Sequence, residues 1–179
     1  MKIFIGCSSS EKINKKYLEE ASNLGQELAN IDGMELLFGY SDEGSMGRLY
    51  KAFINNEKKV SGYNTPIYNT NLKCHNTIIC DTIIDRTKAL LQSADIWLFL
   101  PGGIGTHQEL FCAIDLKRTY NLTNKLIIYN DNGFYDNVIN TIKIIEKEKF
   151  SEDIMKNICV LTNTRDIIKN VKEGIDNER

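Results

Sequence analysis

The stretch DIWLFLPGGIGTHQEL, residues 95–110, decides the fold class that the sequence predicts. Its continuous apolar run is typical of a parallel strand that is covered on both faces. The three glycines that follow allow positive φ angles and let a ligand approach the backbone closely. A helix that begins just after this loop would direct unpaired N–H groups and the positive end of its dipole toward it. The stretch therefore predicts an α/β unit with an anion site, most naturally for phosphate, at the end of the strand.

Apolar runs and helical patterns alternate along the rest of the chain. This alternation predicts one doubly wound, mostly parallel sheet with helices on both faces, in a single domain over residues 1–179. Ligands bind such sheets at the carboxyl ends of the strands, so the loops after the strands are the places to look. We expect strands at 2–6, 34–38, 59–63, 95–100, 125–129 and 157–161, helices at 17–31, 47–56, 82–92, 106–120, 134–148 and from 164 onward, and a polar loop at 64–76.

The composition is typical of a soluble globular protein, with 42% hydrophobic and 26% charged residues among 179. A net charge of −2 argues against a nucleic-acid partner and against an anionic membrane surface. No apolar run approaches the length of a bilayer span. The five cysteines are odd in number and form no C-x-x-C pair, which argues against a disulfide scaffold and a zinc site. We therefore expect a cytoplasmic protein with reduced cysteines and no metal site.

The known glycine fingerprints do not fit the loop. Gly103-Ile-Gly105 lacks the third glycine of G-x-G-x-x-G, and the first strand is followed by GCSSS, residues 6–10. A nicotinamide-dependent enzyme is therefore disfavoured. The chain contains no G-K-[ST] sequence, which excludes a P-loop.

Thr106 and Glu109 allow two interpretations. Thr-x-x-Glu is a capping box, in which the threonine caps a helix and the glutamate bonds back to the N–H of the cap. In the functional interpretation, Glu109 lies beside a bound anion and acts on the adjoining part of the ligand. Local spacing does not separate these two interpretations.

The motif P-G-G-x-G-T-x-x-E resembles the signature of the LOG ("Lonely guy") family, the cytokinin riboside 5′-monophosphate phosphoribohydrolases that were long mislabelled as lysine decarboxylases. GCSSS is similar to the first loop of the family, and Arg86 falls on the arginine of its M-x-x-R-K motif. The resemblance covers about residues 2 to 150. The residues that match the nine-residue motif are Pro101, Gly102, Gly103, Gly105, Thr106 and Glu109, and those that match the G-G-G-x-x-G-L-M-G motif are Gly39, Gly44, Met46 and Gly47.

The resemblance implies a Rossmann-like fold, a homodimer with its sites at or near the subunit interface, and no metal or redox cofactor. It implies hydrolysis of the N-glycosidic bond of a nucleoside 5′-monophosphate to a free base and ribose 5-phosphate. Arg86 and Glu109 would be the catalytic pair. Phosphate and substrate would be bound by Gly102, Gly103, Gly105, Thr106, Ser8, Ser9, Met46 and Gly47.

The chain also departs from the family pattern. The G-G-G of the family is Gly39-Tyr40-Ser41 here, and the two added side chains are expected to change how closely this loop approaches a ligand. Residues 62–80 show no clear family pattern. We expect phosphate binding and glycosidic chemistry to be kept while base recognition differs. The alternative is a nucleotide- or cofactor-binding carrier on the same fold, without turnover.

Overall fold

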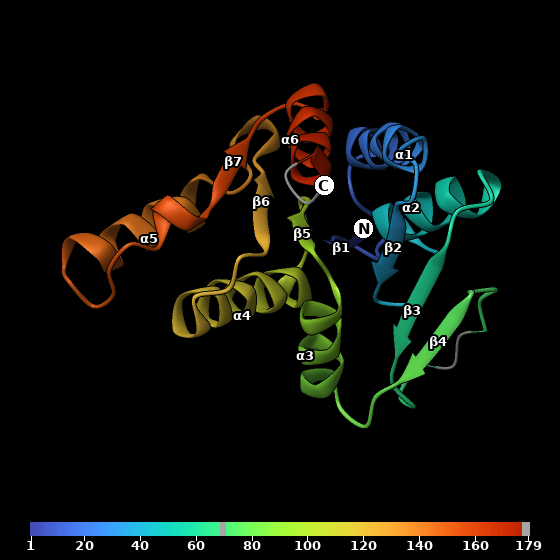
Figure 1. The fold of residues 1–179 in the computed structure, drawn as a ribbon, viewed down its shortest axis with the longest axis horizontal. Helices are drawn as coiled ribbons and strands as arrows, with labels where there is room; N and C mark the ends of the chain where they lie inside the picture. The colour runs from blue at the N-terminus through green and yellow to red at the C-terminus, as the bar shows by residue number, and fades with distance from the viewer. Residues whose placement is uncertain (69–70, 177–179) are drawn as a thin grey trace.

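The computed structural model describes residues 1–68 and 71–176, and a single parallel sheet lies at its centre (Figure 1). Its strands are β1 (Lys2–Gly6), β2 (Glu35–Phe38), β3 (Val60–Asn64), β4 (Asn76–Ile79), β5 (Ile96–Phe99), β6 (Lys125–Tyr129) and β7 (Cys159–Leu161). They lie in the order β4-β3-β2-β1-β5-β6-β7. Every neighbouring pair is parallel. The sequence predicted a mostly parallel sheet, and the sheet is entirely parallel over the described residues.

Helices cover both faces of this sheet, as the alternation of the sequence predicted. They are α1 (Lys15–Ala29), α2 (Gly44–Asn55), α3 (Ile83–Ser93), α4 (Ile104–Tyr120), α5 (Asp136–Lys147) and α6 (Thr164–Asp176). Side chains of α1, α2 and α6 share one core with Ile3 and Ile5, while those of α3, α4 and α5 share a second core with Phe4. Successive strand residues point to opposite faces, so β1 contributes to both cores. Figure 1 shows the two groups of helices on opposite sides of the sheet.

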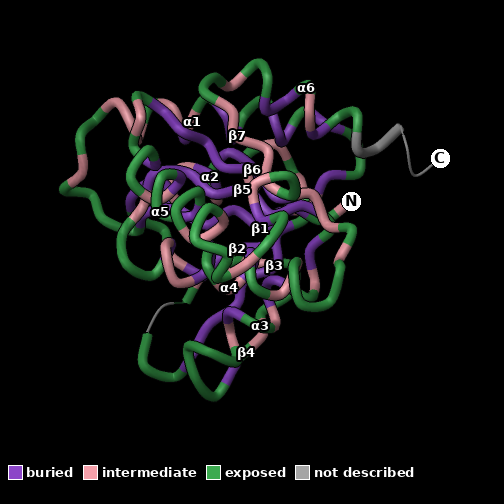
Figure 2. Tube along the Cα trace, turned by 90° about the vertical axis from the view of Figure 1, so that its left-hand side faces the viewer, coloured by how far each residue is buried: buried purple, intermediate pink, exposed green. Residues whose placement is uncertain are grey.

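The edge strand β4 was not predicted from the sequence. Its first residue, Asn76, was predicted to be the last residue of the polar loop at 64–76. Its residues are mostly exposed, as Figure 2 shows beside the buried central strands. It also follows β3 without a helix in the described part of the connection, residues 65–68 and 71–75. Both features remove the alternation that revealed the other strands.

The position of β1 beside β5 opens a crevice at the carboxyl ends of the strands. From this pair the strand order runs outward in both directions, toward β4 and toward β7. The chain after β1 leads to α1 on one face, and the chain after β5 leads to α4 on the other. Diverging connections of this kind form the usual ligand site of a doubly wound sheet. Over the described residues, no helix combines the length and apolar character that crossing a membrane would require.

Candidate active site

A cavity of about 400 Å³ lies in this crevice. It is lined by residues 7–10 after β1, by residues 39–41 after β2, by Tyr68 after β3, by the first turn of α3 after β4, and by the first two turns of α4 after β5. Five stretches of chain, each of which follows one of the strands β1 to β5, therefore meet around one space. Arg86, Glu109, Gly103, Gly105, Thr106, Ser8, Ser9 and Met46, all expected at the site, are among the residues that line it.

The start of α4 forms the anion-binding part of the cavity. Gly103 is the N-cap residue and has no side chain that could bond to the first turn. A Cβ atom built on Gly103 or on Gly105 meets no other atom within 4 Å, so the backbone is open to the cavity there. Unpaired N–H groups and the positive end of the helix dipole bind anions well. The first turn of α4 can therefore hold a phosphate group.

Thr106 does not cap this helix, so the capping-box interpretation is wrong. The helix begins at Ile104, two residues earlier than the sequence predicted, which places Thr106 inside its first turn. The buried Thr106 hydroxyl donates a hydrogen bond to the carbonyl oxygen of Cys7 at 3.1 Å. Thr106 thus joins the start of α4 to the loop after β1, the two sides of the crevice.

Glu109 lies in the second turn of α4 and is only 5% exposed. Its nearest charged partner is Arg86, with 3.7 Å between Nη2 and Oε1. A Cβ atom on Gly6 would come within 3.2 Å of the Glu109 carboxylate and 2.7 Å of the Phe99 ring, so the glycine that ends β1 makes room for both groups. Burial raises the pKa of Glu109 to about 7, and Arg86 partly offsets this rise. The carboxyl group can therefore gain and lose a proton near neutral pH.

Arg86 projects from the first turn of α3 and is held from several sides. Its Nη1 donates to the carbonyl oxygen of Gly39 at 3.3 Å, and its guanidinium carbon lies 5.8 Å from the centre of the Tyr68 ring. Its Nε is buried and has no hydrogen-bond partner in the part of the chain that the structure describes. The arginine thus lies between Glu109 and the loops after β2 and β3.

The loop after β1, residues 7–10, is held in place by contacts with α2. The carbonyl oxygen of Ser8 accepts a hydrogen bond from the N–H of Met46 at 3.0 Å. A Cβ on Gly44 would overlap the backbone of Ser8 and Ser9. Glu11 accepts hydrogen bonds from Gly44 N–H and from both terminal nitrogens of Arg48. The serine N–H and hydroxyl groups are therefore held in place beside the start of α4.

Gly47 and Gly102 do not line the cavity, although the family resemblance assigned them to substrate binding. A Cβ on Gly47 would collide with the carbonyl group of Asp42, and one on Gly102 would collide with the Thr106 side chain. Each glycine allows a close packing contact next to the site. They allow close packing in the loops at the edge of the cavity and are not among the residues that line it.

Tyr40 replaces a family glycine without changing the backbone conformation that a glycine allows. It has a φ of 64°, in the left-handed region where non-glycine residues are uncommon. Its ring packs over Gly62, and its hydroxyl exchanges hydrogen bonds with the backbone of Leu72, each at 3.1 Å. The added side chain therefore supports the connection between β3 and β4 while its ring edges the cavity.

Six lining residues were not among the predicted site residues, namely Cys7, Ser10, Gly39, Tyr40, Ser41 and Tyr68. Cys7 and Ser10 are neighbours of expected residues, and the loop at 39–41 was expected to approach the ligand, so a simple extension of each loop would have included all but Tyr68. Tyr68 lies in residues 62–80, where no pattern singled it out. Burial and the nearby Glu109 strongly raise the pKa of the Cys7 thiol. Cys7 therefore stays protonated and is a poor nucleophile.

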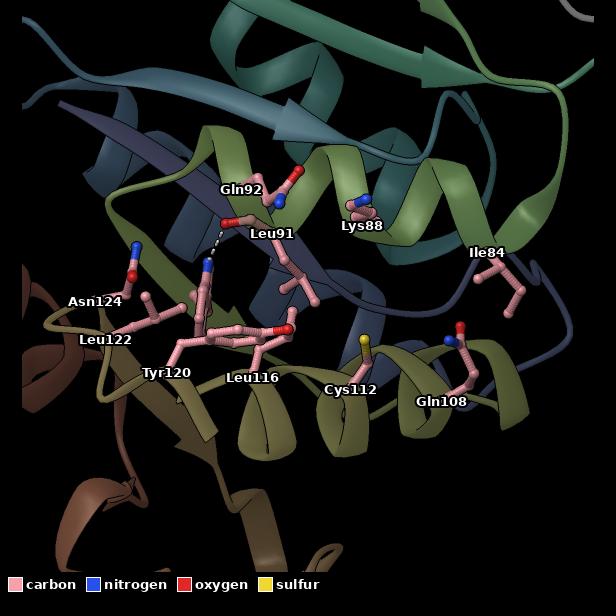
Figure 3. Close-up of a pocket in the computed structure, with 11 residues that line it drawn as sticks. Ile84, Lys88, Leu91, Gln92, Gln108, Cys112, Leu116, Tyr120, Leu122 and Asn124 are labelled. Carbon is pink, nitrogen blue, oxygen red and sulfur yellow. Dashed lines mark hydrogen bonds between the residues drawn. The ribbon is translucent and has the colours of Figure 1, made fainter. Parts of the chain in front are cut away.

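A larger cavity of about 820 Å³ lies outside the crevice, between α3 and α4 (Figure 3). Figure 3 shows Leu91 of α3 and Leu116 of α4 within it. Its lining is mostly apolar and contains no carboxylate. Size alone would favour this cavity as the site, but the acidic and basic groups and the open helix start all lie in the smaller one. A hydrogen bond of 3.1 Å from the Thr87 hydroxyl to Gln108 joins α3 and α4 next to Arg86 and Glu109.

Comparison with solved structures identifies the same fold in other proteins. The chain superposes on the molybdenum cofactor carrier protein of Chlamydomonas reinhardtii with a TM-score of 0.74, 16% identity and 98% of each chain covered. The molybdenum cofactor binding protein of Rippkaea orientalis gives a TM-score of 0.73 and 18% identity, with 97% of this chain and 96% of that chain covered. At these identities the likeness shows the fold alone.

Curated relatives are more similar in sequence. A probable cytokinin riboside 5′-monophosphate phosphoribohydrolase of Oryza sativa subsp. japonica, LOGL6, is 27% identical over 170 residues, which are 91% of this chain and 66% of that protein. The cytokinin riboside 5′-monophosphate phosphoribohydrolase LOG2 of Arabidopsis thaliana is 28% identical over 165 residues, 89% of this chain and 76% of that protein. The family described as "Possible lysine decarboxylase" matches residues 46–171, well over half of the chain. The chain therefore belongs to this family, the LOG family.

Proposed function

We propose that this protein hydrolyses the N-glycosidic bond of a nucleoside 5′-monophosphate, giving a free base and ribose 5-phosphate. One observation carries the proposal: a buried glutamate and arginine lie 3.7 Å apart in the same cavity as an open helix start that can hold a phosphate. The relatives named above, described as phosphoribohydrolases of this kind, support it.

Substrate binding begins at the phosphate. The N–H groups at the start of α4 and the serines after β1 bind it, which sets the ribose beside Glu109. As the bond between C1′ and the base nitrogen breaks, its electron pair leaves with the base and C1′ becomes oxocarbenium-like. The Glu109 carboxylate stabilises this positive charge and accepts a proton from the attacking water. The water oxygen bonds to C1′, and the proton passes to the departing base.

Arg86 holds the reacting groups in register. Its guanidinium stays charged at every relevant pH and offers a fork of donors. Two of its nitrogens already face Glu109 and the Gly39 carbonyl, and its buried Nε lacks a partner among the described residues. It keeps part of the Glu109 population ionised at neutral pH and contacts the ribose or the phosphate.

A nucleotide- or cofactor-binding carrier is the second candidate. It is favoured by the fold shared with a molybdenum cofactor carrier protein. A carrier, however, gains nothing from Glu109, because a buried carboxylate repels an anion unless the anion binds beyond it. Binding without product formation would identify a carrier.

The decisive test is release of free base from AMP, CMP, GMP, UMP, an N6-prenylated AMP and the deoxy forms. We expect wild-type protein to release the base from at least one of them and Glu109→Gln to lose at least a hundredfold in rate. Glu27→Gln, the same change at an exposed position of α1, is the matched control and should keep wild-type activity. No release from any nucleotide that binds would reject the hydrolase and leave the carrier.

The protein is further proposed to be a homodimer that forms through α3 and α4. The apolar cavity between these helices is edged by side chains that a monomer leaves in water, with Ile84 65% and Tyr120 67% exposed. Ile83 and Phe111 on the same helices are also exposed. Exposed apolar side chains gathered on neighbouring helices favour an interaction site. A second copy of the chain would cover this surface next to the helices that carry Arg86 and Glu109.

The cytoplasm is the proposed compartment. All five cysteines, Cys7, Cys74, Cys80, Cys112 and Cys159, are free. Free thiols fit a reducing environment.

A further inference from the structure

We propose that Tyr68 is the residue on which the nucleotide base stacks, so that the site selects planar aromatic bases through the loop after β3. This inference rests on the proposed function, because it assigns the base-binding part of the same cavity. Tyr68 lies in the segment without a family pattern, where base recognition was expected to differ.

Tyr68 presents a large ring to the cavity. It lines this space and is 46% exposed, and no hydrogen bond of its hydroxyl is found within residues 1–68 and 71–176. An exposed ring with an unengaged hydroxyl contributes little to the core. Its open surface is available to a flat ligand group.

The backbone that carries Tyr68 is nevertheless well held. Its N–H donates to the carbonyl oxygen of Thr65 at 3.0 Å, and its own carbonyl accepts from the amide of Asn64 at 3.2 Å. Asn64 and Thr65 are both buried. Such a platform loses little conformational freedom when a ligand binds, which favours affinity.

The position of Tyr68 in the cavity fits a base and not a phosphate. Arg86 lies between the Glu109 carboxylate at 3.7 Å and the Tyr68 ring at 5.8 Å. The phosphate end of the cavity is the start of α4, which precedes Glu109 by more than one turn of the helix. With C1′ beside Glu109, the base extends away from the phosphate and toward Arg86 and Tyr68. Stacking on the ring holds the base in this direction while its bond to C1′ breaks.

The rival explanation is that Tyr68 only positions Arg86 through a cation–π contact. The two roles differ in which ligands they affect. A stacking residue contributes to the binding of nucleotides and not to the binding of ribose 5-phosphate, which has no base. A residue that only positions Arg86 affects both ligands, or lowers kcat without changing nucleotide affinity.

The experiment measures equilibrium binding of AMP, CMP and ribose 5-phosphate to protein that also carries Glu109→Gln, which prevents turnover. We expect Tyr68→Ala to weaken binding of AMP by about five- to a hundredfold, as base–aromatic stacking predicts. The loss should be smaller for the single-ring base of CMP. Binding of ribose 5-phosphate should stay within twofold, and Tyr68→Phe should bind all three ligands as the parent does. Phe150→Ala, an exposed aromatic residue outside the cavity, is the control and should change nothing.

The inference would be overturned if Tyr68→Ala lost as much affinity for ribose 5-phosphate as for AMP, or if its affinity for AMP were unchanged. Failure of AMP and CMP to bind the parent protein would overturn it too. Base release by otherwise wild-type protein is measured in parallel. If the wild-type protein releases base but Tyr68→Ala does not weaken nucleotide binding selectively, only the stacking role is rejected. If Tyr68→Ala weakens nucleotide binding selectively but no base is released, only the hydrolase is rejected.

Discussion

Glu109 shows at the scale of one residue how the fold changes the chemistry of a side chain. Its carboxyl group is almost completely buried, and its charged partner Arg86 is 3.7 Å away, outside hydrogen-bond distance. Burial therefore dominates, and the pKa of the group rises from 4.5 to about 7. The other carboxylate oxygen lies next to Gly6. A carboxyl group in such a place costs stability when it ionises, and functional sites commonly contain groups of this kind.

This cost should be visible in the pH dependence of stability. Between pH 4.5 and about 7 the unfolded chain loses the Glu109 proton while the folded chain keeps it, so the free energy of unfolding falls as the pH rises through this window. At about 1.4 kcal/mol for each pKa unit, the loss approaches about 3 kcal/mol. Glu109→Gln removes this loss, so its stability relative to wild type should increase from pH 5 to pH 8.

Urea denaturation across this range measures the difference between the two proteins. The exposed Glu27→Gln should show no such trend relative to wild type. A constant difference between Glu109→Gln and wild type at every pH would show that the carboxyl group is not raised in pKa.

At the scale of the element, the start of α4 depends on two adjacent glycines that have different roles. Gly102 must lack a side chain because Thr106 packs against its backbone, whereas Gly103 faces open space. Gly102→Ala should lower the free energy of unfolding by about 1–3 kcal/mol through overpacking. Gly103→Ala should cost less than about 1 kcal/mol, the loss of a favourable N-cap residue. Urea denaturation compares them, and equal costs would contradict the packing role of Gly102.

The same helix shows why local sequence patterns were an incomplete guide. Thr106-x-x-Glu109 has the spacing of a capping box, but the helix begins at Ile104. The Thr106 hydroxyl bonds to Cys7, which is 99 residues away in the sequence. A capping pattern depends on residues within one turn, whereas this contact depends on the pairing of β1 with β5. The helix itself was predicted correctly, and its first turn was not.

At the scale of the whole molecule, the surface of α3 and α4 leads to a prediction about assembly. Ile84→Asp and Tyr120→Lys place charges on the proposed interface. The helix dipole favours a negative charge in the first turn of α3 and a positive charge at the end of α4, so neither change should destabilise its helix. Sedimentation of wild-type protein should show a dimer, and each variant should shift it to a monomer. Phe150→Asp alters an exposed residue outside this surface and should stay dimeric. A monomeric wild type, or variants that remain dimers, would contradict the proposed interface.

The sequence by itself determined the fold class and pointed to most of the residues of the candidate site. Alternating patterns of period two and 3.6 reveal strands and helices because each buries one face. The glycine loop predicts an anion site because the properties that favour anion binding are local to the backbone. The motif around Glu109 indicated the family, which the match over residues 46–171 established.

Only the tertiary structure decided which of these residues meet. Arg86 and Glu109 lie on different helices, and they approach because α3 and α4 pack together on the same face of the sheet. Gly47 and Gly102 carry the family pattern but do not line the cavity, while Tyr68 carries no pattern and lines it. Packing between distant segments fixes the direction of a side chain. Spacing along the chain specifies only its nearest neighbours, so the packing of the sheet and its helices was needed to assemble the site.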